Sequence, residues 1–128
     1  FEIDLAHRLT FHKWKCFNVH GHRYKIIVEL TGDVDWNWML VDFGDLKYIK
    51  ERLDENWDHS YIYCNKDEVW KYLTEQWYRT FNMEELEPTA ENMSMFLYMH
   101  FKDIEPRVSK VIVYETPTAY ALFPNNVQ

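Results

Sequence analysis

Residues 1–9 read Phe-Glu-Ile-Asp-Leu-Ala-His-Arg-Leu, and residues 20–30 read His-Gly-His-Arg-Tyr-Lys-Ile-Ile-Val-Glu-Leu. Both runs alternate, and because successive side chains of a β-strand point to opposite faces, each run predicts a strand with one apolar face. That face carries His7 in the first run, and His20 and His22 in the second. If residues 10–19 connect an antiparallel pair, His7 lies opposite His20 or His22, where facing side chains approach to about 5 Å. The two runs therefore predict three imidazoles that converge on one point.

Three histidines with a vacant fourth position are the ligand set of a catalytic zinc site. Cys16 lies four residues before His20, so the run Cys16-x3-His20-Gly21-His22 also fits a closed structural site in which the thiolate is the fourth ligand. Each histidine could instead be an ordinary core residue with its hydrogen bonds satisfied. The spacing alone leaves all three interpretations open.

Composition narrows the class of protein. A chain of 128 residues that is 47% hydrophobic predicts one domain over residues 1–128, with no apolar stretch long enough to cross a bilayer. Its two cysteines give no disulfide framework, and a thiol beside a metal motif suits a reducing compartment, so we expect a cytoplasmic protein.

Charge is unevenly distributed along the chain. The formal net charge of -7 argues against nucleic acid as the main partner. No Asp or Glu occurs from Leu5 to Val28, however, and the Lys and Arg residues of this stretch make it a basic island around the metal motif. Such a field favours a small polyanionic substrate, although a solvated basic loop would show the same composition.

The rest of the chain predicts strands, then helices, then a strand. Residues 38–43 read as a third strand, residues 45–57 and 67–81 have helical spacing, and Thr89 is placed to cap a helix that ends near Lys102. Strands are expected at 108–116 and 120–123. This order predicts an α+β fold, with helices on one face of the sheet and the other face against another subunit.

Two further features could carry chemistry. Asp58-His59 directly follows the first predicted helix, where the pair could transfer protons near Cys16, or where His59 could simply interact with the helix C-terminus. Glu115 follows an apolar run, so its carboxylate needs donors. An internal Lys or Arg would supply them, and so would the amino-pyrimidinone edge of a pterin or guanine.

Six motifs in order resemble the 6-pyruvoyl-tetrahydropterin synthase and 6-carboxytetrahydropterin synthase family. They cover nearly the whole chain, from residue 1 to about residue 121. The motifs are Ala6-His7-Arg8-Leu9, Cys16-x3-His20-Gly21-His22, Asp42-Phe43-Gly44-Asp45-Leu46-Lys47, Asp58-His59, Pro88-Thr89-Ala90-Glu91-Asn92 and Val113-Tyr114-Glu115-Thr116-Pro117-Thr118.

The resemblance implies the tunnelling fold, an antiparallel sheet with helices packed on one face, whose subunits form a barrel, commonly as two stacked trimers with active sites between subunits. It also implies a zinc cofactor and a role for each matching residue. These are His7, His20 and His22 as metal ligands, Cys16, Asp58 and His59 as the acid-base group, Glu115 gripping the pterin, and Thr89 and Glu91 as a second pterin-side motif.

Within the family, the short gap between Cys16 and His20 and the segment 42–47 resemble the bacterial branch that serves queuosine and related 7-deazaguanine synthesis. That branch converts 7,8-dihydroneopterin triphosphate to 6-carboxy-5,6,7,8-tetrahydropterin and releases acetaldehyde and triphosphate, without a redox cofactor. The alternatives are a 6-pyruvoyl product, formed without carbon-carbon cleavage, and a non-catalytic zinc-stabilised module that binds pterin or purine. Two departures stand out, since Trp38 replaces the family's usual glycine and residues 63–86 are longer than in compact members.

Overall fold

The two alternating runs form the centre of the sheet in a computed structural model that describes residues 1–125. Strand β1 (Glu2–His7) pairs antiparallel with β2 (His20–Leu30), and the register places His7 opposite His20. Ile3 and Leu5 on β1, and Tyr24 and Ile26 on β2, are buried on the same face. The predicted hairpin and its histidine pairing are therefore confirmed.

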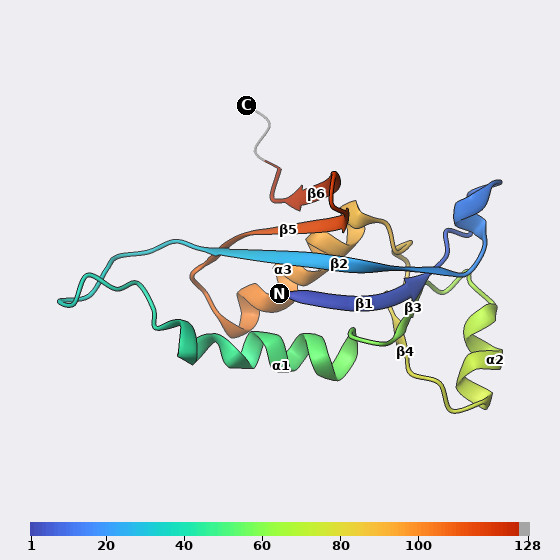
Figure 1. Cartoon of the computed structure of the whole chain (residues 1–128), viewed down its shortest axis with the longest axis horizontal. Helices are drawn as coiled ribbons and strands as arrows, with labels where there is room; N and C mark the ends of the chain where they lie inside the picture. The colour runs from blue at the N-terminus through green and yellow to red at the C-terminus, as the bar shows by residue number, and fades with distance from the viewer. Residues whose placement is uncertain (126–128) are drawn as a thin grey trace.

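The sheet continues differently on its two sides. Strand β5 (Val108–Thr116) pairs antiparallel with β2, and β6 (Ala119–Phe123) pairs antiparallel with β5, so the predicted strands are confirmed and β5 is central. On the other side, β3 (Tyr61–Tyr63) lies parallel to β1, and β4 (Thr80–Asn82) lies parallel to β3. The order is β4-β3-β1-β2-β5-β6 (Figure 1). The sheet is thus mixed. The expected antiparallel pairing holds for β1, β2, β5 and β6, whereas β3 and β4, which are too short to show a period in the sequence, pair in parallel.

Two helices cover the buried face, as predicted. Helix α1 (Lys47–Asn56) contributes Ile49 and Leu53 to the core, and α3 (Ala90–Ile104) contributes Met93, Leu97 and Phe101. Figure 1 shows α3 behind β2 and β5, and α1 alongside β1. The Thr89 hydroxyl accepts a hydrogen bond from the Asn92 N–H, which confirms this residue as the N-cap of α3.

The predicted strand at 38–43 was wrong. The Asp35 carboxylate accepts hydrogen bonds from the backbone N–H groups of Asn37 and Met39, so this segment forms a turn instead of pairing with a strand. Trp38 has φ 64° and its side chain is 84% exposed. Glycine adopts this left-handed conformation without steric cost, whereas a tryptophan has a Cβ that opposes it. A glycine, which is the residue usual in the family, would therefore suit this turn better than Trp38. The segment continues into the 3-10 turn η2 (Phe43–Leu46), capped by Asp42, and then into α1.

The predicted helix at 67–81 is much shorter. Helix α2 runs only from Val69 to Glu75, and Trp77, with φ 65°, lies beyond its end. Phe81 continues the helical spacing in the sequence but belongs to β4, where its ring packs against Trp57 of the core. The helical spacing predicted from the sequence therefore combined residues of helix α2 with Phe81, which belongs to a strand. Within residues 1–125, none of the helices has both the length and the apolar character needed to cross a membrane.

Candidate metal centre

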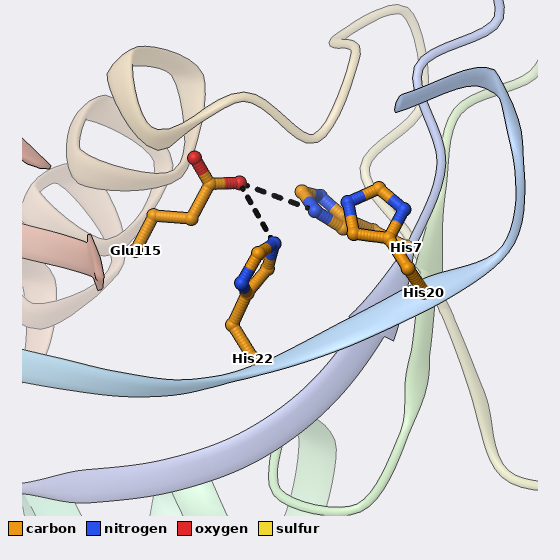
Figure 2. A group of neighbouring side chains, drawn as sticks. All are labelled: His7, His20, His22 and Glu115. Carbon is orange, nitrogen blue, oxygen red and sulfur yellow. Dashed lines mark ion pairs between the residues drawn. The ribbon is translucent and has the colours of Figure 1, made fainter. Parts of the chain in front are cut away.

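The three histidines lie together on the core face of the sheet, at the end of β1 and the start of β2. Strand alternation extends the buried row Ile3, Leu5 to His7, and the row Ile26, Tyr24 to His22 and His20. The ring centroids are 4.7 Å apart for His7 and His20, 5.5 Å for His7 and His22, and 5.0 Å for His20 and His22. Figure 2 shows the three rings turned toward one region.

Backbone carbonyls orient two of the rings. Nδ1 of His7 lies 2.7 Å from the carbonyl oxygen of Pro88, and Nδ1 of His20 lies 2.7 Å from that of Asn18. Since a carbonyl oxygen only accepts, each Nδ1 must carry the proton and each Nε2 keeps its lone pair. A second hydrogen bond of this kind is what fixes the tautomer of a metal-binding histidine.

Glu115 lies beside these rings. Its Oε1 is 3.2 Å from Nε2 of His7 and 3.5 Å from Nε2 of His22 (Figure 2). The close contact with His7 is the largest of several influences that hold the pKa of Glu115 below its ordinary value, although burial acts in the opposite direction. Burial lowers the pKa of His22, while the charge of Glu115 raises it. In β5, Val111, Val113 and Glu115 share one face, so strand alternation alone could have placed this carboxylate among the histidines.

Tyr24 is a member of the site that sequence reasoning missed. It is fully buried, and its hydroxyl lies 3.3 Å from Nε2 of His7 and donates to Oε1 of Glu115 at 3.4 Å. Burial, followed by the charge of Glu115, a hydrogen bond to it and the charge of Cys16, raises the pKa of the phenol. The phenol therefore stays protonated and acts as a donor. The sequence signal was present, since Tyr24 follows His20 and His22 at the same two-residue spacing.

This donor set fits a single metal ion. One ligand atom from each of the residues His7, His20, His22 and Glu115 lies within 4.8 Å of the other three. Two bonds of about 2.0 Å in a tetrahedral zinc site place their ligand atoms about 3.3 Å apart, which is close to the separations between Glu115 and the two histidines. Imidazole and carboxylate together are ligands that Zn²⁺ accepts.

Cys16 lies in the 3-10 turn η1 (Lys15–Phe17) and is half-buried. Its backbone carbonyl accepts a hydrogen bond of 2.7 Å from the Leu9 N–H, two residues beyond His7. Among residues 1–125, its sulfur is not one of the ligand atoms that gather with the histidines. The geometry therefore favours nitrogen and oxygen ligands over a site closed by the thiolate.

Asp58 and His59 form a separate group with Asp4. Nδ1 of His59 lies 3.0 Å from Oδ2 of Asp58, and Oδ1 of Asp58 accepts from the Asp4 N–H at 2.9 Å. Burial tends to raise the pKa of Asp58, but these hydrogen bonds lower it overall. Asp4 belongs to the strand positions that alternate with Ile3, Leu5 and His7, so the structure of one chain does not bring this pair to the histidines.

Thr89 and Glu91 lie at the start of α3. Thr89 caps the helix, and Glu91 is an exposed residue of its first turn. The neighbouring Pro88 carbonyl is the group that orients His7. The Pro88–Asn92 motif thus contacts the metal site through the backbone carbonyl of Pro88 and not through the side chains of Thr89 and Glu91.

The fold and the donor set define an α+β domain with a histidine-rich candidate site for one metal ion. The family described as 6-pyruvoyl tetrahydropterin synthase matches residues 1–126, and the chain belongs to this family.

Curated relatives agree with this assignment, and solved structures share the fold. The chain is 35% identical over 130 residues to a 6-carboxy-5,6,7,8-tetrahydropterin synthase of Haemophilus influenzae, covering 94% of this chain and 92% of the relative. It is 32% identical to a protein of the same name from Rickettsia felis, covering 93% and 92%. An uncharacterized protein of Wolinella succinogenes has a similar structure, with a TM-score of 0.83, 22% identity and coverage of 98% and 94%. The 6-pyruvoyl tetrahydropterin synthase of Caenorhabditis elegans shares the fold, with a TM-score of 0.71, 24% identity and coverage of 96% and 89%.

Proposed function

We propose that this protein converts 7,8-dihydroneopterin triphosphate to 6-carboxy-5,6,7,8-tetrahydropterin, with release of acetaldehyde and triphosphate, on the queuosine pathway in the cytoplasm. The observation that carries the proposal is the convergence of three imidazoles with their Nδ1 atoms tied to carbonyls, in a chain similar to relatives named for this product. Three histidine ligands that would leave a coordination position open suit a catalytic metal better than a purely structural one.

Zinc would be held by His7, His20 and His22. When bound, it would polarise a hydroxyl or carbonyl oxygen of the substrate side chain and so would lower the cost of removing a proton from the adjacent carbon. His22 is prepared to bind because burial lowers its pKa and keeps the ring neutral near pH 7.

Cys16 would move that proton. A thiolate accepts a proton and the resulting thiol can return it, which is the chemistry of a general base and acid. Lys13 and Lys15 flank Cys16 on its N-terminal side and are candidates for meeting the triphosphate.

Glu115 would grip the pterin ring. Its carboxylate accepts two parallel N–H groups in the way that the amino-pyrimidinone edge requires. Thr89 and Glu91 would add to the pterin side of the site from the start of α3. The same position of Glu115 would also allow Oε1 to complete the metal coordination, and the variant Glu115→Gln separates the two roles.

Asp58 and His59 would act on Cys16 of a neighbouring copy, in a homotrimer or hexamer. In support, a cavity of about 540 Å³ beside His59 is lined by Ala6, Gly21, Tyr61 and Tyr78, among others. Segment 10–19, which contains Cys16, carries exposed aromatic side chains, with Phe11 62% and Trp14 72% exposed. Such aromatics are typical of interface residues.

Incubation of the zinc-loaded protein with 7,8-dihydroneopterin triphosphate, followed by mass spectrometry, tests the proposal. Equal amounts of 6-carboxytetrahydropterin and acetaldehyde support it. The 6-pyruvoyl product without acetaldehyde would move the protein to the other branch. Pterin binding without any turnover would leave only a binding module.

A further inference from the structure

We infer that Asp67 is a positioning residue that holds Arg8, and through Arg8 the turn that carries Cys16. This inference rests on the proposed role of Cys16 as the group that moves the proton. It also assigns a task to the long segment 63–86, since Asp67 lies at the junction of β3 and α2.

Asp67 is 1% exposed and its carboxylate is fully engaged. Oδ1 accepts from Nε of Arg8 at 2.9 Å and from the Val69 N–H at 2.9 Å, while Oδ2 accepts from the Tyr61 hydroxyl at 2.5 Å. Burial and the bond to Asp67 raise the pKa of Tyr61, so the phenol remains a donor. A buried carboxylate with donors on both oxygens is a fixed point against which a guanidinium can be oriented.

Arg8 carries this restraint to the turn. Its side chain is 13% exposed, its Nη1 donates to the Phe17 carbonyl at 3.3 Å, and its Cζ lies 4.5 Å from the centre of the Phe17 ring. One planar group thus binds Asp67 through Nε and Phe17 through Nη1 and its face. A lysine has no fork and cannot hold both partners in this geometry.

The two ends of this link are next to the chemistry. Arg8 directly follows His7, and Phe17 directly follows Cys16. A change in the Arg8 orientation therefore shifts the thiol relative to the first histidine. Proton transfer depends steeply on such placement, because a displacement of about 1 Å in a catalytic group can cost a hundredfold in rate.

The chain contains a matched control cluster far from Cys16. Glu105, also nearly buried, accepts from Nε of Arg107 at 2.6 Å and from the Tyr48 hydroxyl at 2.7 Å. This cluster has the same carboxylate, arginine and tyrosine composition as that of Asp67, but it joins the end of α3 to α1. Glu105→Gln should therefore lower stability without affecting the thiol.

The experiment compares Asp67→Asn, Arg8→Lys and Glu105→Gln as full-length, zinc-loaded proteins. Alkylation of Cys16 by iodoacetamide, followed by peptide mass spectrometry, reports the freedom of the turn, and steady-state kinetics report kcat and KM. Cys64 is 1% exposed and reports general loosening of the fold. Phe17→Leu is a further variant that removes only a ring that is 45% exposed, so it should fold even if Asp67→Asn does not.

In Asp67→Asn and Arg8→Lys we expect Cys16 to react at least about fivefold faster and kcat to fall about tenfold, with KM within about twofold and zinc content unchanged. Phe17→Leu should raise the alkylation rate about twofold. Glu105→Gln should change neither the alkylation rate of Cys16 nor kcat. If the Asp67, Arg8 and Phe17 variants match Glu105→Gln in both readouts, Asp67 is merely structural. If the wild type turns over no substrate, the proposed function fails, whereas the alkylation ratios still decide the positioning role.

Discussion

Replacement of Gly21 by alanine tests whether the spacing of β1 and β2 sets the metal site. Gly21 lies between His20 and His22 and opposite Ala6. A Cβ at this position would lie 3.1 Å from the Leu5 carbonyl oxygen, where ordinary contact begins at 3.4 Å. Its φ is not positive, so the backbone itself accepts alanine and only the contact is strained.

The contact is thus about 0.3 Å too short, and the backbone of β1 must move by this amount at Leu5, two residues before His7. Such a movement exceeds the roughly 0.2 Å by which metal-ligand distances can vary. We expect zinc affinity to fall about tenfold, which corresponds to about 1.4 kcal/mol. The free energy of unfolding should fall by about 1–2 kcal/mol, as for other overpacked sites.

Competition with a chelating dye measures the affinity, and urea unfolding measures the stability. Gly32→Ala is the control, because its Cβ would meet the Leu40 Cδ1 at 3.0 Å, which is the end of a flexible side chain. Its zinc affinity should stay within about twofold of wild type. Wild-type zinc affinity in Gly21→Ala, at unchanged oligomeric state, would refute the reasoning.

Three further predictions concern single residues. Cys16→Ala should retain zinc and pterin binding but lose turnover by about a thousandfold, as measured by product formation, and turnover at the wild-type rate would remove the thiol from the mechanism. Glu115→Gln should keep one zinc per chain by elemental analysis while KM rises about tenfold, whereas loss of zinc would make Glu115 a metal ligand. Hydrogen bonds from Arg107 and Tyr48 lower the pKa of Glu105 to about 2 from 4.5, so its contribution to stability is complete above about pH 4.5 and is lost as the pH falls toward 2. Glu105→Gln should therefore be less stable than wild type by about 1 kcal/mol at pH 7, with a smaller difference at pH 3 in urea unfolding; equal differences at both pH values would contradict this.

The central part of the fold could be predicted because its strands alternate without interruption. The period of two in β1 and β2 determines which side chains share a face, and the three histidines follow from it. The capping residue Thr89 and the helical spacing of α1 and α3 are equally local signals. Each of these features depends on residues close together in the sequence.

The remaining elements depend on contacts that no local pattern contains. Strands β3 and β4 are three residues long and exist because β3 pairs with β1 and β4 pairs with β3. Phe81 matched the helical stripe, yet it packs against Trp57 from a strand. The Asp67 and Arg8 contact joins residues 59 positions apart, and nothing in the spacing of either residue indicates it.

X-ray absorption at the zinc edge of the purified protein tests the central claim most directly. We expect one zinc per chain with histidine nitrogens and an oxygen at about 2.0–2.1 Å, and the same spectrum in Cys16→Ala. A zinc-sulfur distance of about 2.3 Å that disappears in Cys16→Ala, or wild-type zinc content after replacement of His7 and His22 by alanine, would contradict the account.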